Sequence, residues 1–310
     1  MKAFPVFDAH CDTALELWER QASLRQNSGQ WDLARAAQLP GWAQFFAFCP
    51  ICSPFAAELG AEAVLARAYA QFLQQLEACQ LPVCRDAAEV EQQLPTGAVL
   101  LSLEGAEGIG CDPGRLEPLR LQGFAMTGLT WNYENSLAGS HMTGQGLSAR
   151  GADYVRAAQQ LGMLVDVSHA SDEAFWQVCR MTQGPILASH SNSRAVCPES
   201  RNVTDGMYAA ICETGGVVGL NFYTEFLGRG QVDFETVWHH LDHFLQLAGD
   251  DRHVALGADL DGCDSLPDGF TGVASYPALA AYLADRGLGE ETLRRLYFEN
   301  LMGVYRQCMN

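Results

Sequence analysis

Six side chains that could bind a metal ion stand at or just beyond the ends of short apolar runs. The runs read PVFDAHCD, AVLLSLEG, GMLVDVSH, PILASHS and HVALGADLDG. In chain order they carry His10, Asp12, Glu104, His169, His190 and Asp259. Imidazole nitrogens and carboxylate oxygens are common zinc ligands in proteins. Taken singly, each run could be an ordinary strand end with a hydrogen-bonded histidine or a paired acid. Five runs with the same pattern predict a metal site.

The number of donor groups indicates more than one ion. His10 and Asp12 are two residues apart, so on a strand their side chains point to the same side. Together with Glu104, His169 and His190 they exceed what one tetrahedral zinc ion uses. Two ions would use all of them: His10 and Asp12 on one ion, His169 and His190 on the other, and Glu104 between. A water held by two such ions loses a proton near neutral pH and becomes a nucleophile.

Eight runs that could form strands are placed to bring these residues together. They are short and almost continuously apolar, as strands are in a parallel sheet covered by helices. They span 4–12, 43–50, 98–105, 123–131, 162–169, 185–191, 215–222 and 253–262. Helical patterns occupy 59–79, 149–160, 172–181, 234–248 and 290–307. This alternation predicts a (β/α)8 barrel, in which all the strands end at one rim. No linker divides the chain, so we expect one domain spanning 1–310.

The capping residues support three of the helices. Ser148, Ser171 and Asp233 each precede a helical pattern, and their side-chain oxygens can accept a backbone N–H of the first turn.

Charge and composition exclude several classes of partner. The formal net charge is −18, with 19 basic and 37 acidic residues. Nucleic acid and anionic membranes both need clustered cations, so neither is an expected partner. The chain begins without the apolar segment of a signal peptide, which favours a cytoplasmic location. Lys2 is the only lysine. A Schiff base or a carboxylated lysine bridging two metals therefore has no residue to use.

Two tempting patterns receive ordinary interpretations. Cys49 and Cys52 have the spacing of a redox or zinc motif, but no second such pair exists, and eleven scattered cysteines without a secretion signal favour reduced thiols. His239, His240 and His243 lie in a helical pattern without HExxH. We expect them to form a polar face of an outer helix.

The order of the motifs resembles one known family. The stretches FDAHCD, LSLEGAEGI, VDVSHAS, ASHSNSRAVCPESRNVTD and HVALGADLDG run from residue 7 to residue 262. They are similar to the renal (membrane) dipeptidases, zinc metallopeptidases of the amidohydrolase superfamily. The resemblance implies an amidohydrolase-type barrel with two Zn²⁺ per chain at the C-terminal rim. It implies that a glutamate bridges the metals where many relatives use a carboxylated lysine, in agreement with the lysine count. The implied zinc ligands are His10, Asp12, Glu104, His169 and His190.

The same resemblance assigns roles to residues around the metals. Glu104 serves catalysis as the bridge, and Asp259 matches the aspartate that shuttles a proton. Asp261 competes for that role, but it lies two residues further on, leading into a loop. Arg201 matches the arginine that binds the free carboxylate of the substrate, and Tyr223 is a weaker candidate for the same pocket. The implied activity is hydrolysis of dipeptides, including those with a D-residue at the C-terminal position. The expected partners are the dipeptide and a second copy of the chain in a homodimer.

One departure from the family pattern concerns the carbonyl of the scissile bond. The best-known members carry a histidine after the fourth strand, in an LTH sequence, whereas this chain has Trp131 there. Asn132 or the loop residue His141 could donate a hydrogen bond instead, or the metal could act alone, so all three residues join the candidates for substrate binding.

Other functions stay open at this point: another amidohydrolase acting on lactones, phosphotriesters or cyclic amides, or a metal-binding barrel without activity.

Overall fold

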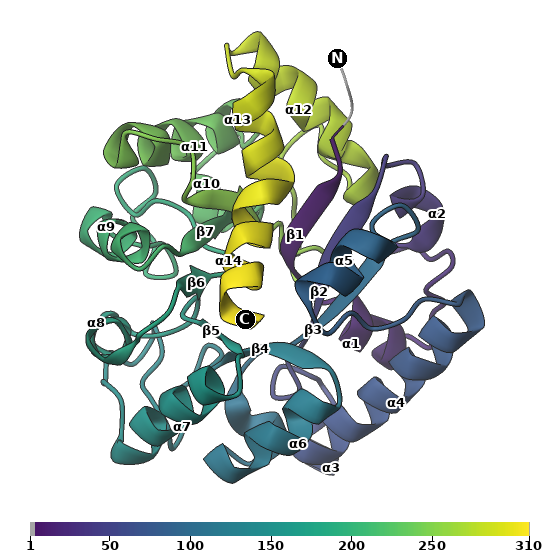
Figure 1. The fold of residues 1–310 in the computed structure, drawn as a ribbon, viewed down its shortest axis with the longest axis vertical. Helices are drawn as coiled ribbons and strands as arrows, with labels where there is room; N and C mark the ends of the chain where they lie inside the picture. Colours follow the sequence, from purple (N-terminus) through teal and green to yellow (C-terminus); the bar gives the residue numbers. More distant parts are fainter. Residues whose placement is uncertain (1–3, 310) are drawn as a thin grey trace.

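Eight parallel strands close into a barrel in the computed structural model, which describes residues 4–309 (Figure 1). The strands are β1 (Val6–Cys11), β2 (Trp42–Phe48), β3 (Ala98–Leu103), β4 (Phe124–Gly128), β5 (Leu164–Asp166), β6 (Ile186–Ala188), β7 (Val217–Leu220) and β8 (Val254–Leu256). Each pairs with the next in chain order, and β8 returns to β1 with Asp8 opposite Leu256. The predicted (β/α)8 barrel is confirmed. Lys2 lies outside the described residues.

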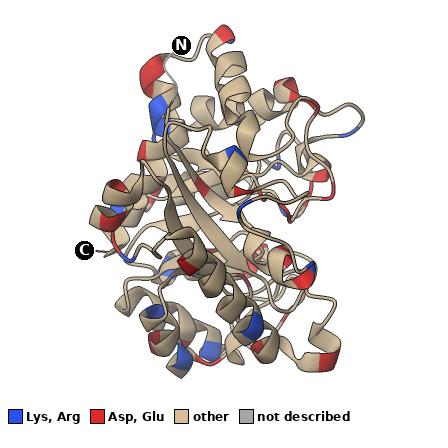
Figure 2. Ribbon diagram, turned by 90° about the vertical axis from the view of Figure 1, so that its right-hand side faces the viewer, with Lys and Arg blue, Asp and Glu red and all other residues tan. Residues whose placement is uncertain are grey.

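Helices surround the barrel, as Figure 1 shows. They are α1 (Thr13–Glu19), α2 (Leu33–Ala36), α3 (Ala56–Leu59), α4 (Ala61–Cys79), α5 (Ala87–Gln93), α6 (Leu116–Leu121), α7 (Ala149–Gln160), α8 (Asp172–Met181), α9 (Asp205–Glu213), α10 (Thr224–Leu227), α11 (Phe234–Ala248), α12 (Tyr276–Asp285), α13 (Glu290–Arg294) and α14 (Asn300–Met309). Charged residues lie mostly on these helices and their loops (Figure 2). The strands are buried along their whole length, so the sheet separates an inner core from an outer one.

One end of the barrel is filled by aromatic rings and by the C-terminal helix. Phe7 of β1 stacks on Phe45 of β2 with ring centroids 5.8 Å apart. Tyr305 of α14 meets Phe7 edge-on at 6.4 Å. In Figure 1, α14 crosses in front of this end of the barrel. The chain therefore closes the N-terminal end and leaves the C-terminal rim for the site.

Capping fixes the start of three predicted helices. Ser148 accepts a hydrogen bond from the Gly151 N–H at α7, and Ser171 accepts from the Ala174 N–H at α8. Asp233 begins α11 with a full capping box. All three helices begin where the sequence predicts, because the cap satisfies an N–H group that the first turn leaves free.

The ends of several strands differ from the prediction. The fifth was expected to reach residue 169 but stops at Asp166, whose carboxylate accepts the N–H of Ser168 at 3.0 Å and so turns the backbone out of the ladder. The eighth was expected to reach residue 262 but ends at Leu256. Asp259 and Asp261 follow it with positive φ angles of 60° and 66°, which no strand residue adopts. His169, His190 and Asp259 therefore lie on short turns that follow their strands, whereas His10 lies within β1.

Two helices also differ from their predicted bounds. The helix expected over 59–79 begins at Ala61, because Gly60 has a φ of 81° and separates it from α3. The helix expected over 290–307 is interrupted by a π-helical turn, Arg295–Glu299, and continues to Met309.

Candidate active site

The six predicted residues meet at the C-terminal rim around Glu104, which directly follows β3. One carboxylate oxygen, Oε1, lies 2.6 Å from His169 Nε2 and 3.5 Å from His190 Nε2. The other, Oε2, lies 3.3 Å from His10 Nε2. Glu104 thus stands between the histidines that follow β5 and β6 and the histidine of β1. This is the geometry expected of a bridging carboxylate.

The described residues contain three groups of three donors at this centre, and one of them, His10, Asp166 and His190, includes a carboxylate that lies behind the histidines. The other two groups contain the residues that the sequence predicts. The ligand atoms of Glu104, His169 and His190 lie within 4.8 Å of one another. Those of His10, Asp12 and Asp259 satisfy the same limit, with His10 Nε2 at 3.7 Å from Asp12 Oδ2 and 3.8 Å from Asp259 Oδ1. The second group therefore contains Asp259 in addition to the predicted His10/Asp12 pair.

Two further observations indicate that these residues suit divalent cations. His10 Nε2 and Asp12 Oδ1 are buried and have no hydrogen-bond partner within residues 4–309. Leaving a buried polar atom unpaired costs about 1–3 kcal/mol, and coordination to a cation removes this penalty. Gly262 is the second observation, since a Cβ there would collide with Asp12 Oδ2 and Asp259 Oδ1. Glycine keeps the space between these two carboxylates open.

The electrostatics of the cluster keep the lone pairs of two of its three histidines available. Burial lowers the pKa of the third, His10, but Glu104 and Asp12 raise it well above its ordinary value. Burial, reinforced by Arg201, lowers the pKa of His169 to about 4. Burial and the neighbouring His10 hold the pKa of His190 well below its ordinary value. Burial alone would raise the pKa of Glu104, but His10 and His169 hold it well below its usual range. Two neutral imidazoles and a charged carboxylate are the protonation states that a metal requires.

A buried carboxylate that sequence reasoning missed orients two of the histidines. Asp166 Oδ1 accepts the Ser189 N–H at 2.9 Å, and its Oδ2 accepts the Ser189 hydroxyl. The Ser189 oxygen lies 2.7 Å from His190 Nδ1 and 3.4 Å from His10 Nδ1. Because the serine hydrogen goes to Asp166, its oxygen accepts from His190 Nδ1–H, and Nε2 keeps its lone pair for the cluster. The detectable signal was an aspartate inside the apolar run of VDVSH.

A second missed carboxylate, Asp8, holds the β1 end of the site. Its Oδ1 accepts the His10 N–H at 2.9 Å, and its Oδ2 accepts the Ala258 N–H at 2.9 Å and the Tyr276 hydroxyl. Burial raises the pKa of Asp8, although these hydrogen bonds oppose the shift. Asp8 ties the strand that carries His10 to the turn that carries Asp259.

The two aspartates that competed in the sequence have different surroundings. Asp259 accepts from Asn221 Nδ2 at 3.0 Å, and burial raises its pKa to about 7. Asp261 accepts from the Thr13 hydroxyl at 2.6 Å and from the backbone N–H of Gln30. Asp261 is therefore engaged in holding loops together, whereas Asp259 belongs to the donor cluster.

A cavity of about 580 Å³ opens above the cluster. Arg201 reaches it from the loop between β6 and α9 and is only 4% exposed. Its Nη1 donates to the carbonyl of Ser168, its Nη2 lies 3.0 Å from His169 Nε2, and its carbon Cζ lies 5.4 Å from the Phe226 ring centroid. The Nε of Arg201 is buried and has no partner in the described part of the chain. Tyr223 lines the same cavity.

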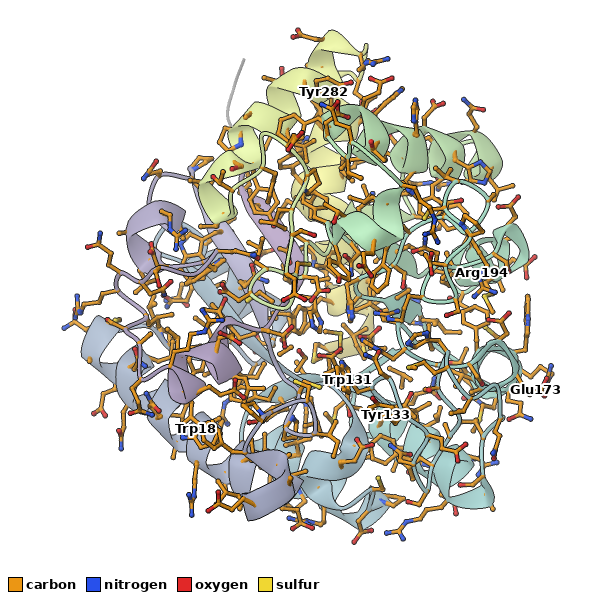
Figure 3. The ribbon with its side chains drawn as sticks, turned by 180° about the vertical axis from the view of Figure 1, so that it is seen from behind. Trp18, Trp131, Tyr133, Glu173, Arg194 and Tyr282 are labelled. Atoms are coloured by element: carbon orange, nitrogen blue, oxygen red, sulfur yellow. The ribbon has the colours of Figure 1, made fainter. Side chains whose placement is uncertain are left out.

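The turn after β4 forms another wall of the cavity. Trp131 and Asn132 both line it, and Figure 3 shows Trp131 near the centre of the ring of elements. Asn132 Oδ1 lies 3.0 Å from His169 Nδ1 and 3.0 Å from His141 Nε2. His141 is not among the cavity-lining residues, and its Nδ1 lies 2.8 Å from the Ser200 hydroxyl. It stands behind Asn132.

The prediction for the histidines of α11 is wrong at His240. His239 and His243 pair with surface carboxylates, but His240 is fully buried. Its Nδ1 accepts the Ser193 N–H at 3.0 Å, and its Nε2 donates to the Leu227 carbonyl at 2.8 Å. Burial lowers its pKa to about 4, so the ring is neutral and can do both. Helical geometry turns this one residue toward the loop that carries Arg201.

The eleven cysteines are buried or partly buried. All eleven are free, and the Cys52 thiol, which lines the cavity, donates to the carbonyl of Cys49 at 2.8 Å.

Comparison with known proteins decides the family. The sequence matches the membrane dipeptidases, peptidase family M19, over residues 1–310. The chain belongs to this family. An uncharacterised dipeptidase of Schizosaccharomyces pombe is 30% identical to it over 329 aligned positions, covering 98% of this chain and 80% of the relative.

Two solved structures are similar along their whole length. A metallopeptidase from Rhodobacter sphaeroides, liganded with a phosphinate mimic of L-Ala-D-Ala, has 30% identity and a TM-score of 0.88, covering 99% of this chain and 100% of its own. The family M19 metallopeptidase called dipeptidase AC has 31% identity and a TM-score of 0.88, covering 99% of both chains. This membrane dipeptidase family member is a peptide-bond hydrolase of the metallo-dipeptidase class. In the part of the chain that the structure describes, no helix combines the length and apolar character needed to cross a bilayer.

Proposed function

We propose that this chain is a zinc-dependent dipeptidase that uses two ions and accepts a D-residue at the C-terminal position of its substrate. The observation that supports this most directly is Glu104, whose two oxygens face separate groups of donors, with His169 at 2.6 Å and His10 at 3.3 Å. A donor set of imidazoles and carboxylates suits zinc. The relative that carries a phosphinate mimic of L-Ala-D-Ala supports the D-residue.

The assignment of ligands follows from the two donor groups. His169 and His190 would hold one ion and His10 and Asp12 the other, with Glu104 shared. When bound, such a pair of cations supplies a Lewis acid for the carbonyl and lowers the pKa of a bound water. The protein's own contribution is to hold the donors in place through the carboxylates behind them.

Arg201 binds the free carboxylate of the dipeptide in this proposal. Its guanidinium is buried at the wall of the cavity, and its Nη2 lies 3.0 Å from a proposed ligand atom, His169 Nε2. A carboxylate held by Arg201 would therefore place the adjoining peptide bond beside the cluster. A cavity of about 580 Å³ is within the ordinary range of ligand pockets, roughly 300–1,000 Å³.

Asp259 carries the proton from the nucleophilic water to the leaving amine. Burial raises its pKa to about 7, so near neutral pH it can both accept and donate a proton. Asn221 Nδ2 donates to its Oδ2 and leaves Oδ1 on the side of the cluster.

The proposal is tested with a library of dipeptides containing L-L and L-D pairs, assayed on zinc-loaded and chelated protein. We expect hydrolysis of dipeptides, loss on chelation, recovery with zinc, and poor turnover of substrates whose C-terminal carboxylate is amidated. Two bound ions per chain should be found by elemental analysis. Equal turnover of amidated dipeptides, or faster turnover of lactones or phosphotriesters, would favour another amidohydrolase activity. Absence of bound metal and of any hydrolysis would indicate a barrel without activity.

A further inference from the structure

The side-chain amide of Asn132 has hydrogen-bond partners at its oxygen but not at its nitrogen. Its Oδ1 lies 3.0 Å from His169 Nδ1 and 3.0 Å from His141 Nε2, so one oxygen meets two ring nitrogens. Its Nδ2 donates to no group in residues 4–309, although the residue lines the cavity. An amide nitrogen carries two N–H donors. Both of them are left to whatever occupies the cavity.

The hydrogen bonds behind Asn132 fix which way its amide faces. His169 contributes Nε2 to the donor cluster, so its hydrogen is on Nδ1 and needs an acceptor. That requirement assigns the atom near His169 as the oxygen of Asn132 and not the nitrogen. His141 supplies the second donor, since it can accept the Ser200 hydroxyl at Nδ1 and donate from Nε2. The two histidines hold the oxygen, and the nitrogen faces the other side.

We propose that Asn132 is a catalytic residue, whose free Nδ2 donates a hydrogen bond to the carbonyl oxygen of the scissile bond as negative charge develops on it. His141 and Ser200 are positioning residues that hold the Asn132 amide in this orientation. The proposal rests on the proposed dipeptidase function and deepens it. It also separates two candidates that the sequence left open: His141 has both ring nitrogens engaged and does not line the cavity, so it does not reach the substrate.

The hydrogen bonds to its side-chain oxygen explain why an asparagine suits this place. Removing one donor to a developing oxyanion typically lowers kcat by about 10²–10³-fold. A donor contributes this much only when it is already oriented and loses no freedom during reaction. Asn132 meets that condition through two hydrogen bonds to its oxygen, one of which also orients the His169 ring.

The test uses Asn132→Asp, which keeps an oxygen for both histidines and removes the N–H donors. Trp131→Phe tests the neighbouring donor on the same wall, the indole N–H. Tyr133→Phe is the matched control, because Tyr133 lies on the same turn but is exposed and does not line the cavity. For each zinc-loaded variant, kcat and KM for dipeptides, bound metal, and the dissociation constant of the phosphinate mimic of L-Ala-D-Ala are measured. We expect Asn132→Asp to keep its metal and KM, to lose about 10²-fold in kcat, and to bind the phosphinate correspondingly more weakly. Tyr133→Phe should keep kcat within a few-fold. Trp131→Phe and His141→Leu should each lower kcat by less than Asn132→Asp.

Other outcomes overturn the proposal. Wild-type kcat in Asn132→Asp would show that its N–H group does not act. Loss of metal in that variant would make Asn132 a support for His169 alone, and an equal loss in Trp131→Phe would transfer the donor role to the indole. If the wild-type protein hydrolyses no dipeptide, the proposed function fails first and this inference fails with it, so the two failures are distinguished by the wild-type assay.

Discussion

Arg201→Met should weaken the binding of dipeptides by about 10- to 150-fold, seen as a rise in KM, because a charge-assisted hydrogen bond contributes roughly 1.5–3 kcal/mol. The structure places the effect in the upper part of this range. Arg201 is only 4% exposed and its Nε has no partner in the described chain, so a substrate carboxylate would meet a largely dehydrated donor. The methionine stem can still pack on the Phe226 ring, which lies 5.4 Å from the guanidinium carbon. The substitution therefore removes the charge and the hydrogen-bond donors while keeping much of the packing.

The decisive assay is a cycle of two proteins and two substrates. Wild type and Arg201→Met are each measured with a dipeptide and with the same dipeptide amidated at its C-terminus. Amidation should cost the wild type about as much as the mutation does, and should cost the variant almost nothing because the contact is already absent. Arg201→Lys, which keeps the charge but loses the planar fork, should fall between the two proteins.

The cycle needs a control for effects on the loop and on the metals. Arg194→Met is matched, since Arg194 lies on the same loop, toward the outside of the ring in Figure 3, and does not line the cavity. It pairs with Asp172 at 2.7 Å and donates to the carbonyls of Ser200 and Asn202, so its removal disturbs the loop without removing a cavity donor. It should raise KM far less than Arg201→Met does. Bound metal is measured throughout, because Arg201 also contacts His169. Equal amidation penalties in wild type and Arg201→Met would refute the assignment of Arg201 to the substrate carboxylate.

Three further outcomes are expected. Glu104→Gln should lower the affinity for both ions, whereas His169→Ala should spare the ion at His10. Elemental analysis after dialysis measures the bound metal in each variant. Two tightly bound ions and full activity in Glu104→Gln would exclude a bridging role for Glu104. Asp259→Asn should keep the metal and lower kcat by about 10²-fold or more, whereas Asp261→Asn should mainly lower the melting temperature. If Asp261→Asn instead lost more kcat and Asp259→Asn lost more thermal stability, the two roles would have to be exchanged. Chelation should abolish activity but leave the far-ultraviolet circular dichroism of a folded barrel, with a lower melting temperature; unfolding on chelation would instead make the metal a structural requirement.

The elements that the sequence predicts well are those with strong local signals. Near-continuous apolar runs identify all eight strands, and Ser148, Ser171 and Asp233 mark the starts of three helices. The ends of the strands were predicted too far along the chain, because apolar composition continues past the point where pairing stops. At β5 a side chain, Asp166, takes over a backbone N–H, and no pattern of hydrophobicity reports that.

At the site, too, the sequence shows some residues and not others. Residues that would touch a metal were recognisable, because histidines and carboxylates at the ends of apolar runs are rare enough to notice. Residues that support them were not. Asp8 and Asp166 act through contacts with residues distant in the chain, Asp8 with Ala258 and Tyr276 and Asp166 with Ser189. Such partners are known only once the barrel is closed.

The seam between the first and last strands has a consequence for how the enzyme matures. The Asp12 N–H donates to the Leu260 carbonyl at 2.8 Å, and the Asp259 N–H donates to the His10 carbonyl at 3.1 Å. The donor group of His10, Asp12 and Asp259 is therefore built from the two ends of the chain, whereas Glu104, His169 and His190 come from its middle. Contacts between residues so far apart in sequence form slowly, because the entropy of closing the long loop between them opposes their formation. During synthesis, we expect the middle group to become complete while the ribosome is still making the last strand. The second group cannot exist until the segment that carries Asp259 has joined β1, so we expect hydrolytic competence to begin only after that segment has been made and docked.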